Sequence, residues 1–180
     1  SGVAGARRFF TSPDVSSVIL NGQSYFNVAI GSGNREMPLS DSCSPEVIAK
    51  NYPDDPTACV ETDDRFYSLR DYEGFGHRDW SRAAPITEAD LVDVTPDAGA
   101  ADVPADVPAG AAGWLLRLES APGEKAVSSS RTFDHTVYFP TFVPAVPAEV
   151  AGAADGACAN AVGHNLLYQV SVFDARPGRH

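Results

Sequence analysis

The chain has 180 residues, 43% of them hydrophobic and 21% charged, which is typical of a globular domain. Its 24 Asp and Glu residues outnumber its 13 Lys and Arg residues, and the resulting net charge of −11 argues against nucleic acid or an anionic membrane as the main partner, because both require a basic surface. No apolar run is long enough to predict a transmembrane helix, and the first residues do not resemble a signal peptide, so the chain is expected to be cytosolic or an internal segment of a longer protein.

Two strands joined by a tight turn are the first predicted elements. Asp14–Leu20 and Gln23–Gly31 are rich in β-branched and aromatic residues, and Asn21-Gly22 lies between them. Asn-Gly supplies the positive φ angles that a type I′ turn needs. The sequence therefore predicts a β-hairpin here.

The second strand runs into Gly31-Ser32-Gly33, a glycine pair of the kind that also occurs in phosphate-binding loops. The GxxxxGK[ST] pattern of a P-loop is missing, and Glu36 stands where the third glycine of GxGxxG would be. Pro38 also disfavours the helix that such loops open. We therefore predict that these residues end a strand in a tight turn, with glycine at positive φ.

A long loop is predicted at about residues 40–62, and it contains two of the three cysteines. Cys43 and Cys59 could form a disulfide in an oxidising compartment, and two buried thiols are the alternative. Cys158 has no obvious partner, and the chain has neither a CxxC motif nor clustered histidines to favour a zinc site. Within the loop, residues 44–52 are predicted to form a short helix.

The sequence offers few candidates for catalysis or metal binding. The adjacent carboxylates of Asp54-Asp55 and Asp63-Asp64 could bind Ca²⁺, which prefers oxygen ligands, but the spacing of an EF-hand loop is missing. Solvated loop carboxylates are the preferred interpretation. The GxSxG pattern of serine hydrolases is also missing, and the aromatic residues lie in or beside strands, as in sheet cores.

The other predicted elements are mostly short strands. They cover residues 64–71, 113–119, 124–130, 135–143 and 165–174. In DRFYSLRD, the first of these, Phe66, Ser68 and Arg70 are expected to face away from the residues between them. A second short helix is predicted at residues 86–94, where Thr87 and Asp90 form a weak capping box.

Further long loops are predicted at about residues 94–112 and 144–163, which are rich in Ala and Pro. We interpret them as insertions within a single segment, 1–180, rather than as linkers between domains. Roughly seven strands in two clusters are too few for a closed barrel but fit about two blades of a β-propeller, with four antiparallel strands each. The predicted fold class is all-β: part of a β-propeller with long loop insertions and one or two short helices.

Five motifs resemble one protein family when they are taken together and in order. They are RRFFTSPDVS (residues 7–16), YFNVAIGSGNREMPL (25–39), DRFYSLRD (64–71), GWLLRLESAPGEKAV (113–127) and VYFPTFVP (137–144). The set resembles the C-terminal β-propeller region of the PilC/PilY family, the adhesins and assembly proteins associated with the tip of type IV pili. The resemblance spans nearly the whole chain and is weakest in the two Ala/Pro-rich loops.

The resemblance implies residues with structural rather than catalytic roles. They are Arg8, Phe9, Phe10, Pro13, Asp14, Gly31, Ser32, Gly33, Arg35, Asp64, Arg65, Tyr67, Arg70, Asp71 and Trp114. Arg35 and Glu36 are expected to pin neighbouring loops. Calcium is expected in the full-length family, but no residue of this chain matches the family's EF-hand-like loop, so no cofactor is assigned to this segment.

The resemblance also implies a location and a function. The chain would be the late part of a longer exported protein, extracellular or associated with the outer membrane at the pilus tip. It would act without catalysis in pilus biogenesis and tip adhesion, through contacts with minor pilins and with host surfaces. The alternatives are a propeller-based enzyme of the quinoprotein or glycan-processing type, whose active-site residues lie outside this segment, and a structural fragment with no partner of its own.

Overall fold

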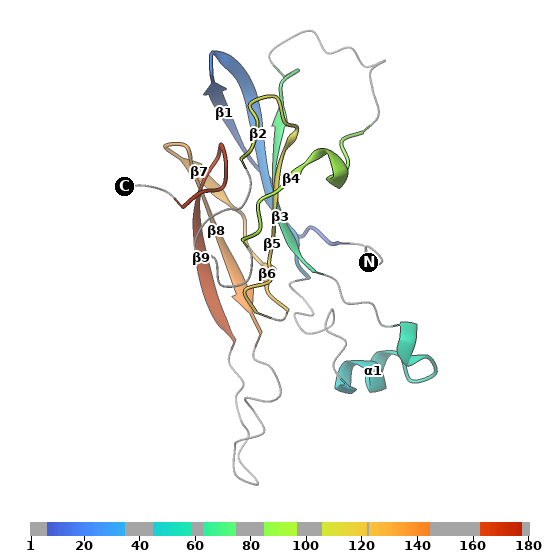
Figure 1. Ribbon diagram of the computed structural model, residues 1–180. Coiled ribbons are helices and arrows are strands. Elements are labelled where there is room, and N and C mark those ends of the chain that lie inside the picture. The colour runs from blue at the N-terminus through green and yellow to red at the C-terminus, as the bar shows by residue number, and fades with distance from the viewer. Residues whose placement is uncertain are drawn as a thin grey trace.

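The computed structural model describes residues 7–34, 45–58, 63–74, 85–96, 106–121, 123–144 and 163–177. The strands in this part of the chain form two β-sheets that lie face to face and share one hydrophobic core (Figure 1). Helical residues in the described ranges are limited to one short α-helix and two 3-10 turns. The all-β class predicted from the sequence is therefore confirmed.

The first sheet contains five strands in the order β1-β2-β3-β5-β4. Their bounds are β1 Asp14–Leu20, β2 Gln23–Gly31, β3 Arg65–Asp71, β5 Gly113–Arg117 and β4 Val92–Asp93. Neighbours among β1, β2, β3 and β5 are antiparallel, so these four form a meander in chain order. The two-residue β4 adds to β5 in parallel orientation.

The predicted hairpin between β1 and β2 is confirmed at its turn. Asn21 has φ 53° and Gly22 has φ 80°, which are the positive values that an I′-type turn requires. The turn fixes the register of the two strands, so that Leu20 lies opposite Gln23 and Val18 opposite Tyr25. As a result, alternate residues of both strands face the second sheet.

The second sheet is built around β8 (Thr136–Val143). Its whole length pairs with β9 (His164–Ser171) on one edge. On the other edge it pairs with β6 (Lys125–Ala126) near its end and with β7 (Arg131–Phe133) near its start. The outer edge of β9 is partly covered, because Ser171 N–H donates to the Arg176 carbonyl over 2.8 Å.

The helix predicted at residues 86–94 is wrong. Only Glu88–Asp90 forms a single 3-10 turn, and Val92–Asp93 is strand β4. The predicted capping interaction is present, since the Asp90 carboxylate accepts hydrogen bonds from Thr87 N–H (2.8 Å) and Thr87 Oγ1 (2.7 Å). These two bonds lower the pKa of Asp90. The helix ends after one turn because Val92 pairs with Trp114 in β5, and this strand pairing overrides the local preference.

The strand predicted at residues 124–130 is also wrong in its length. Only Lys125–Ala126 pairs with β8, and a separate strand, β7, begins at Arg131. The turn between β7 and β8 is made by Asp134 (φ 45°) and His135 (φ 58°). This turn has two positive φ angles without a glycine, and the sequence therefore carried no Asn-Gly or Asp-Gly pattern to predict it.

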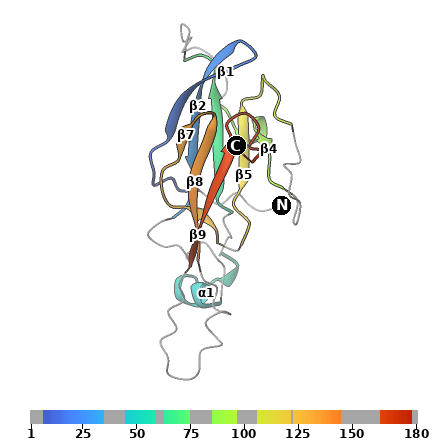
Figure 2. The ribbon, with the colours of Figure 1, turned by 90° about the vertical axis from the view of Figure 1, so that its left-hand side faces the viewer.

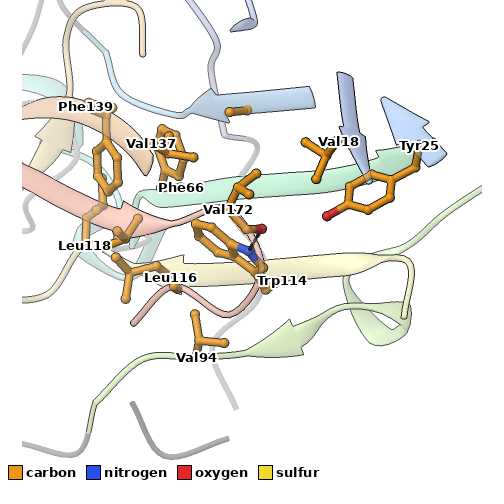
Figure 3. Close-up of a cluster of buried hydrophobic side chains, with 14 residues drawn as sticks. Val18, Tyr25, Phe66, Val94, Trp114, Leu116, Leu118, Val137, Phe139 and Val172 are labelled. Carbon is orange, nitrogen blue, oxygen red and sulfur yellow. Dashed lines mark hydrogen bonds between the residues drawn. The ribbon is translucent and has the colours of Figure 1, made fainter. Parts of the chain in front are cut away.

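The core lies between the two sheets, which overlap when viewed at right angles to Figure 1 (Figure 2). Phe66 from β3 stacks on Phe139 from β8, with 3.7 Å between ring centres. Trp114 from β5 is fully buried, and its indole N–H donates to the Val172 carbonyl over 3.1 Å (Figure 3). Phe66, Trp114 and Phe139 therefore serve as packing between the sheets, as the sequence predicted, whereas Phe9, Phe10 and Phe133 are exposed.

The helix predicted at residues 44–52 is confirmed as α1 (Pro45–Asn51), and a 3-10 turn follows at Pro56–Ala58. Both lie within the predicted loop 40–62, and α1 is placed apart from the two sheets (Figure 1). Residues 94–96 and 106–112, the described parts of the second long loop, contain no helix or strand. None of the described helices is long and apolar enough to cross a membrane.

Candidate functional site

Gly31-Ser32-Gly33 lies where the first sheet meets β6 of the second sheet. Ser32 N–H donates to the Arg65 carbonyl (2.8 Å), and the Ser32 carbonyl accepts from Ala126 N–H (3.0 Å). Gly33 N–H donates to the Arg8 carbonyl over 2.9 Å. We call this region the junction; it comprises Gly31, Ser32, Gly33, Asp64, Glu124, Lys125 and Ala126.

The prediction that these glycines provide positive φ angles is wrong, because the described glycines with positive φ are Gly22, Gly113 and Gly123. The two residues are glycines because β6 approaches closely. A Cβ atom on Gly31 would lie 2.3 Å from the Cβ of Ala126, and one on Gly33 would lie 2.5 Å from the Ala126 carbonyl oxygen. Any side chain at either position would push the second sheet away from the first.

A buried ion pair lies beside these glycines. Lys125 Nζ is 3.8 Å from Asp64 Oδ2, and the side chains are 1% and 3% exposed. Asp64 Oδ1 also accepts a hydrogen bond from Ser32 Oγ over 2.7 Å, and Ser32 Oγ in turn accepts from Arg65 N–H. The charged pair therefore connects β6 to the residues around the start of β3, which suits a structural joint between the sheets.

The neighbouring Glu124 is a buried carboxylate with several donors around it. Oε1 accepts from Thr141 Oγ1 (2.6 Å) and Tyr168 Oη (2.8 Å), and Oε2 accepts from Ser120 N–H (3.0 Å) and Ser120 Oγ (2.5 Å). Burial, together with the negative charge of Glu124, raises the pKa of Tyr168. Because both carboxylate oxygens are occupied by structural donors, Glu124 is not arranged as a general base.

A second charged cluster lies on the surface beside the junction. Glu88 accepts from Arg7 (3.0 Å) and from Arg65 (2.6 Å), and the Tyr67 hydroxyl also donates to it. Burial and the hydrogen bond to Glu88 raise the pKa of Tyr67. The ring of Phe9 lies 6.0 Å from that of Tyr67. This cluster attaches the N-terminal segment to the outer face of the first sheet.

Arg70 fixes two further segments to β3. Its guanidinium donates to the carbonyls of Pro108 (2.7 Å) and Phe173 (2.6 Å), and its Cζ lies 5.5 Å from the centre of the Tyr25 ring. Arg70 is only 2% exposed. A single buried side chain thus joins the segment before β5 to the chain that follows β9.

The remaining residues of the predicted set have local structural roles or lie at the surface. Asp14 accepts from Thr132 N–H over 2.6 Å, which links β1 to β7, and Asp71 accepts from Glu73 N–H over 3.0 Å in the turn after β3. Phe10 is 47% exposed, and Pro13 is exposed just before β1. Five residues discussed above lie outside the described residues: Arg35, Glu36, Cys43, Cys59 and Cys158. The loop contacts of Arg35 and Glu36 and the disulfide between Cys43 and Cys59 therefore stay predictions.

The described residues contain no group of three or more His, Cys, Asp or Glu side chains that could hold a metal ion. Of the paired carboxylates considered for calcium, Asp64 belongs to the junction, and Asp55 accepts from Thr57 N–H over 3.0 Å in a local turn. Asp54 and Asp63 are exposed. The structure does not bring these four carboxylates together as a site.

The outward faces of the two sheets carry exposed apolar side chains. Val15 and Ile19 on β1 are 58% and 64% exposed, Phe133 on β7 is 75% exposed, and Leu167 on β9 is 61% exposed. Residues two apart in a strand share a face, so Val15 and Ile19 lie on the side of β1 opposite the buried Val18. We refer to Val15, Ile19, Phe133 and Leu167 as the outer apolar residues.

We expect the purified chain to self-associate, because β1 is the outermost described strand of its sheet and carries two of these residues. Light scattering should show species larger than a monomer. Replacing Val15 and Ile19 with lysine should shift the distribution toward the monomer, whereas Ser17→Lys, on the same face between them, should have little effect. A monomeric wild type that melts cooperatively above about 60 °C would contradict the expectation.

Four charged residues of these clusters were not singled out from the sequence: Arg7, Glu88, Glu124 and Lys125. Glu124 and Lys125 begin the predicted strand 124–130, and charged residues are rarely buried, so nothing in the local pattern marks them as interior residues. The neighbouring glycines were the available indication, since two close glycines in a strand mark a place where another backbone approaches.

No protein-family model, curated protein or solved structure matches this chain.

Proposed function

We propose that this chain is a non-enzymatic module of a type IV pilus biogenesis and tip adhesion factor that acts through protein–protein contacts. Its partners are minor pilins of the pilus tip complex and, beyond them, host-cell surfaces. The location that follows is extracellular or associated with the outer membrane, as part of a longer exported protein. The observation that carries the contact function is the set of outer apolar residues on both sheets.

The resemblance of the five motifs to the PilC/PilY family supplies the identity of the partner. Four of the motifs meet at or beside the junction: Arg8 and Gly33 are joined through their backbones, Ser32 donates to Asp64, and Lys125 forms an ion pair with Asp64. Segments that are far apart in the sequence thus act as one structural unit. If the five motifs belong to one fold, the segments that carry them are expected to contact one another in this way.

For the fold, we propose that the two sheets are neighbouring blades of a larger β-propeller. In support of this, β1, β2, β3 and β5 form a four-stranded antiparallel meander, which is the unit of a blade. Blades in a propeller are also covered on both faces, and apolar outward residues such as Ile19 and Leu167 suit packing of that kind. No described residue favours the alternative of a propeller-based enzyme.

The test is a binding measurement between the chain and purified minor pilins, with and without Ca²⁺. Two double variants, Val15→Lys/Ile19→Lys and Phe133→Lys/Leu167→Lys, remove the outer apolar residues of one sheet at a time. We expect at least one of them to weaken binding by about tenfold or more, because anchors of this type contribute more than 1 kcal/mol each. Ser17→Lys and Asn165→Lys each add one positive charge on the same faces without removing an apolar side chain, and they should leave affinity within about twofold.

A normally folded chain that binds no minor pilin would overturn the proposed partner. Equal weakening by the double variants and by the single-lysine controls would show that the added lysines act through charge, and the outer apolar residues would then not be the contact surface. Far-UV circular dichroism of each variant confirms that the sheets are intact before binding is compared.

A further inference from the structure

Five side chains on the inward faces of the two sheets carry a buried polar atom that has no hydrogen-bond partner in the described part of the chain. The atoms are Ser16 Oγ, Tyr25 Oη, Asn27 Nδ2, Arg70 Nε and Thr132 Oγ1. Tyr25 and Asn27 are 0% exposed and Arg70 is 2% exposed. We call this set the donor row. Buried polar groups normally find partners because leaving them unpaired is costly, so such a concentration needs an explanation.

Strand register brings the members of the donor row together. Ser16 on β1 lies opposite Asn27 on β2, and Asn27 lies opposite Arg70 on β3. Side chains directly opposite on one face are about 5 Å apart at Cβ. Tyr25 is two residues from Asn27 on the same face of β2, and its hydroxyl points into the interior (Figure 3). Asn27 Nδ2, Arg70 Nε and Tyr25 Oη therefore face a common region between the sheets.

The chemistry of the donor row is that of an anion site. Asn27 Nδ2 and Arg70 Nε can only donate hydrogen bonds, and the Tyr25 hydroxyl can also donate. Asn27 Oδ1 already accepts from Ser68 Oγ over 2.6 Å, so the amide nitrogen is the free end of that side chain. A cation would find only the Tyr25 hydroxyl oxygen as an acceptor among these three atoms.

The charge on Arg70 also favours an anion as the ligand. Nη1 donates to the carbonyls of Pro108 (2.7 Å) and Ala109 (3.3 Å), and Nη2 donates to the carbonyl of Phe173 (2.6 Å). Among the described residues, no carboxylate forms an ion pair with Arg70. Carbonyl oxygens satisfy the hydrogen bonds of the guanidinium but leave its positive charge without a counter-ion in the interior.

We propose that the donor row binds a small monovalent inorganic anion of the chloride class, in contact with Asn27 Nδ2, Arg70 Nε and Tyr25 Oη. The anion neutralises Arg70, which also interacts with the Tyr25 hydroxyl, and it supplies an acceptor for the Asn27 amide, the Tyr25 hydroxyl and Arg70 Nε. Since Arg70 joins β3 to the segments 106–112 and 172–175, anion binding stabilises the packing of the two sheets. A water molecule would satisfy the donors but would not neutralise the charge.

The test measures the melting temperature of the chain as chloride replaces gluconate at constant ionic strength. We expect the melting temperature to rise by several degrees between about 1 mM and about 300 mM chloride and then to saturate, because a ligand that binds only the folded state stabilises it. Non-specific surface binding is a poor explanation for such a rise, since the chain has a net charge of −11.

Tyr25→Phe and Asn27→Leu are the informative variants, and each should move the midpoint of the chloride response upward by about tenfold. Tyr25→Phe is the cleaner of the two because it removes only an unpartnered hydroxyl. Ser130→Ala is the control: its Oγ is also buried between the sheets but donates to the Ala29 carbonyl over 3.1 Å. It should lower the melting temperature and leave the chloride midpoint unchanged.

A crystal grown with sodium bromide gives a direct answer through the anomalous signal of bromine. We expect a peak between Asn27 and Arg70 in the wild type and a weaker peak in Asn27→Leu. The proposal is overturned if the melting temperature does not respond to chloride, if all variants share the wild-type midpoint, or if the crystal shows water alone beside Arg70 Nε.

Discussion

Replacing Gly31 with alanine is expected to lower the free energy of unfolding by about 3 kcal/mol, near the upper end of what overpacking costs. The new Cβ would lie 2.3 Å from the Cβ of Ala126 and 3.1 Å from Cδ2 of Phe66. Neither neighbour is the far end of a flexible side chain, so β6 has to move away from β2. Denaturant unfolding, followed by circular dichroism, measures the change.

Two comparisons show whether the close approach of β6 is the cause. Gly110→Ala is the matched control, because a Cβ on Gly110 would meet nothing within 4 Å, and it should change the unfolding free energy by less than about 0.5 kcal/mol. Adding Ala126→Gly to Gly31→Ala removes the clashing methyl group and should recover part of the loss. If Gly31→Ala unfolds like the wild type, the sheets do not meet at this point.

Replacing Lys125 with methionine is expected to cost about 3 to 5 kcal/mol of folding free energy. The substitution keeps most of the apolar volume but leaves the carboxylate of Asp64, which is 3% exposed, without the ammonium group 3.8 Å away. Keeping a carboxylate buried after its cation has been removed is more costly than the loss of the attraction itself. The same denaturant titration measures the effect.

A double variant and a surface pair provide the controls. Asp64→Asn/Lys125→Met removes both charges and should be more stable than Lys125→Met alone, because no lone buried charge remains. Arg117→Met breaks an exposed ion pair with Asp93 (2.7 Å; side chains 44% and 37% exposed) and should cost less than about 1 kcal/mol. Equal costs for Lys125→Met and Arg117→Met would show that the Lys125–Asp64 pair is solvated.

The sequence predicted the elements whose formation depends on neighbouring residues. The hairpin β1–β2 follows from the φ angles that Asn21-Gly22 adopts easily, and its bounds match the prediction at both strands. The alternation in DRFYSLRD correctly predicted that Phe66, Ser68 and Arg70 share one face of β3, and the structure shows that this is the buried face. Helix α1 was predicted as well, within two residues at its ends.

Pairing between distant segments was not predictable in the same way. Residues 86–94 have a helix-like pattern and a genuine Thr87–Asp90 cap, yet Val92 pairs with β5. The sequence around Arg7, Arg65 or Glu88 does not indicate that these three residues will form ion pairs. They are brought together only when the sheet has formed. The burial of Glu124 and Lys125 likewise depends on where β6 packs.

The sequence by itself thus determined the strand content, the first hairpin and which residues of β3 share a face, because backbone preference and side-chain alternation are properties of consecutive residues. The tertiary structure decided why Gly31 and Gly33 are glycines, which charges are buried, and where unpaired donors gather around Arg70. Each of those outcomes depends on how closely one sheet approaches the other. That distance is fixed by packing between segments far apart in the chain, which no local pattern encodes.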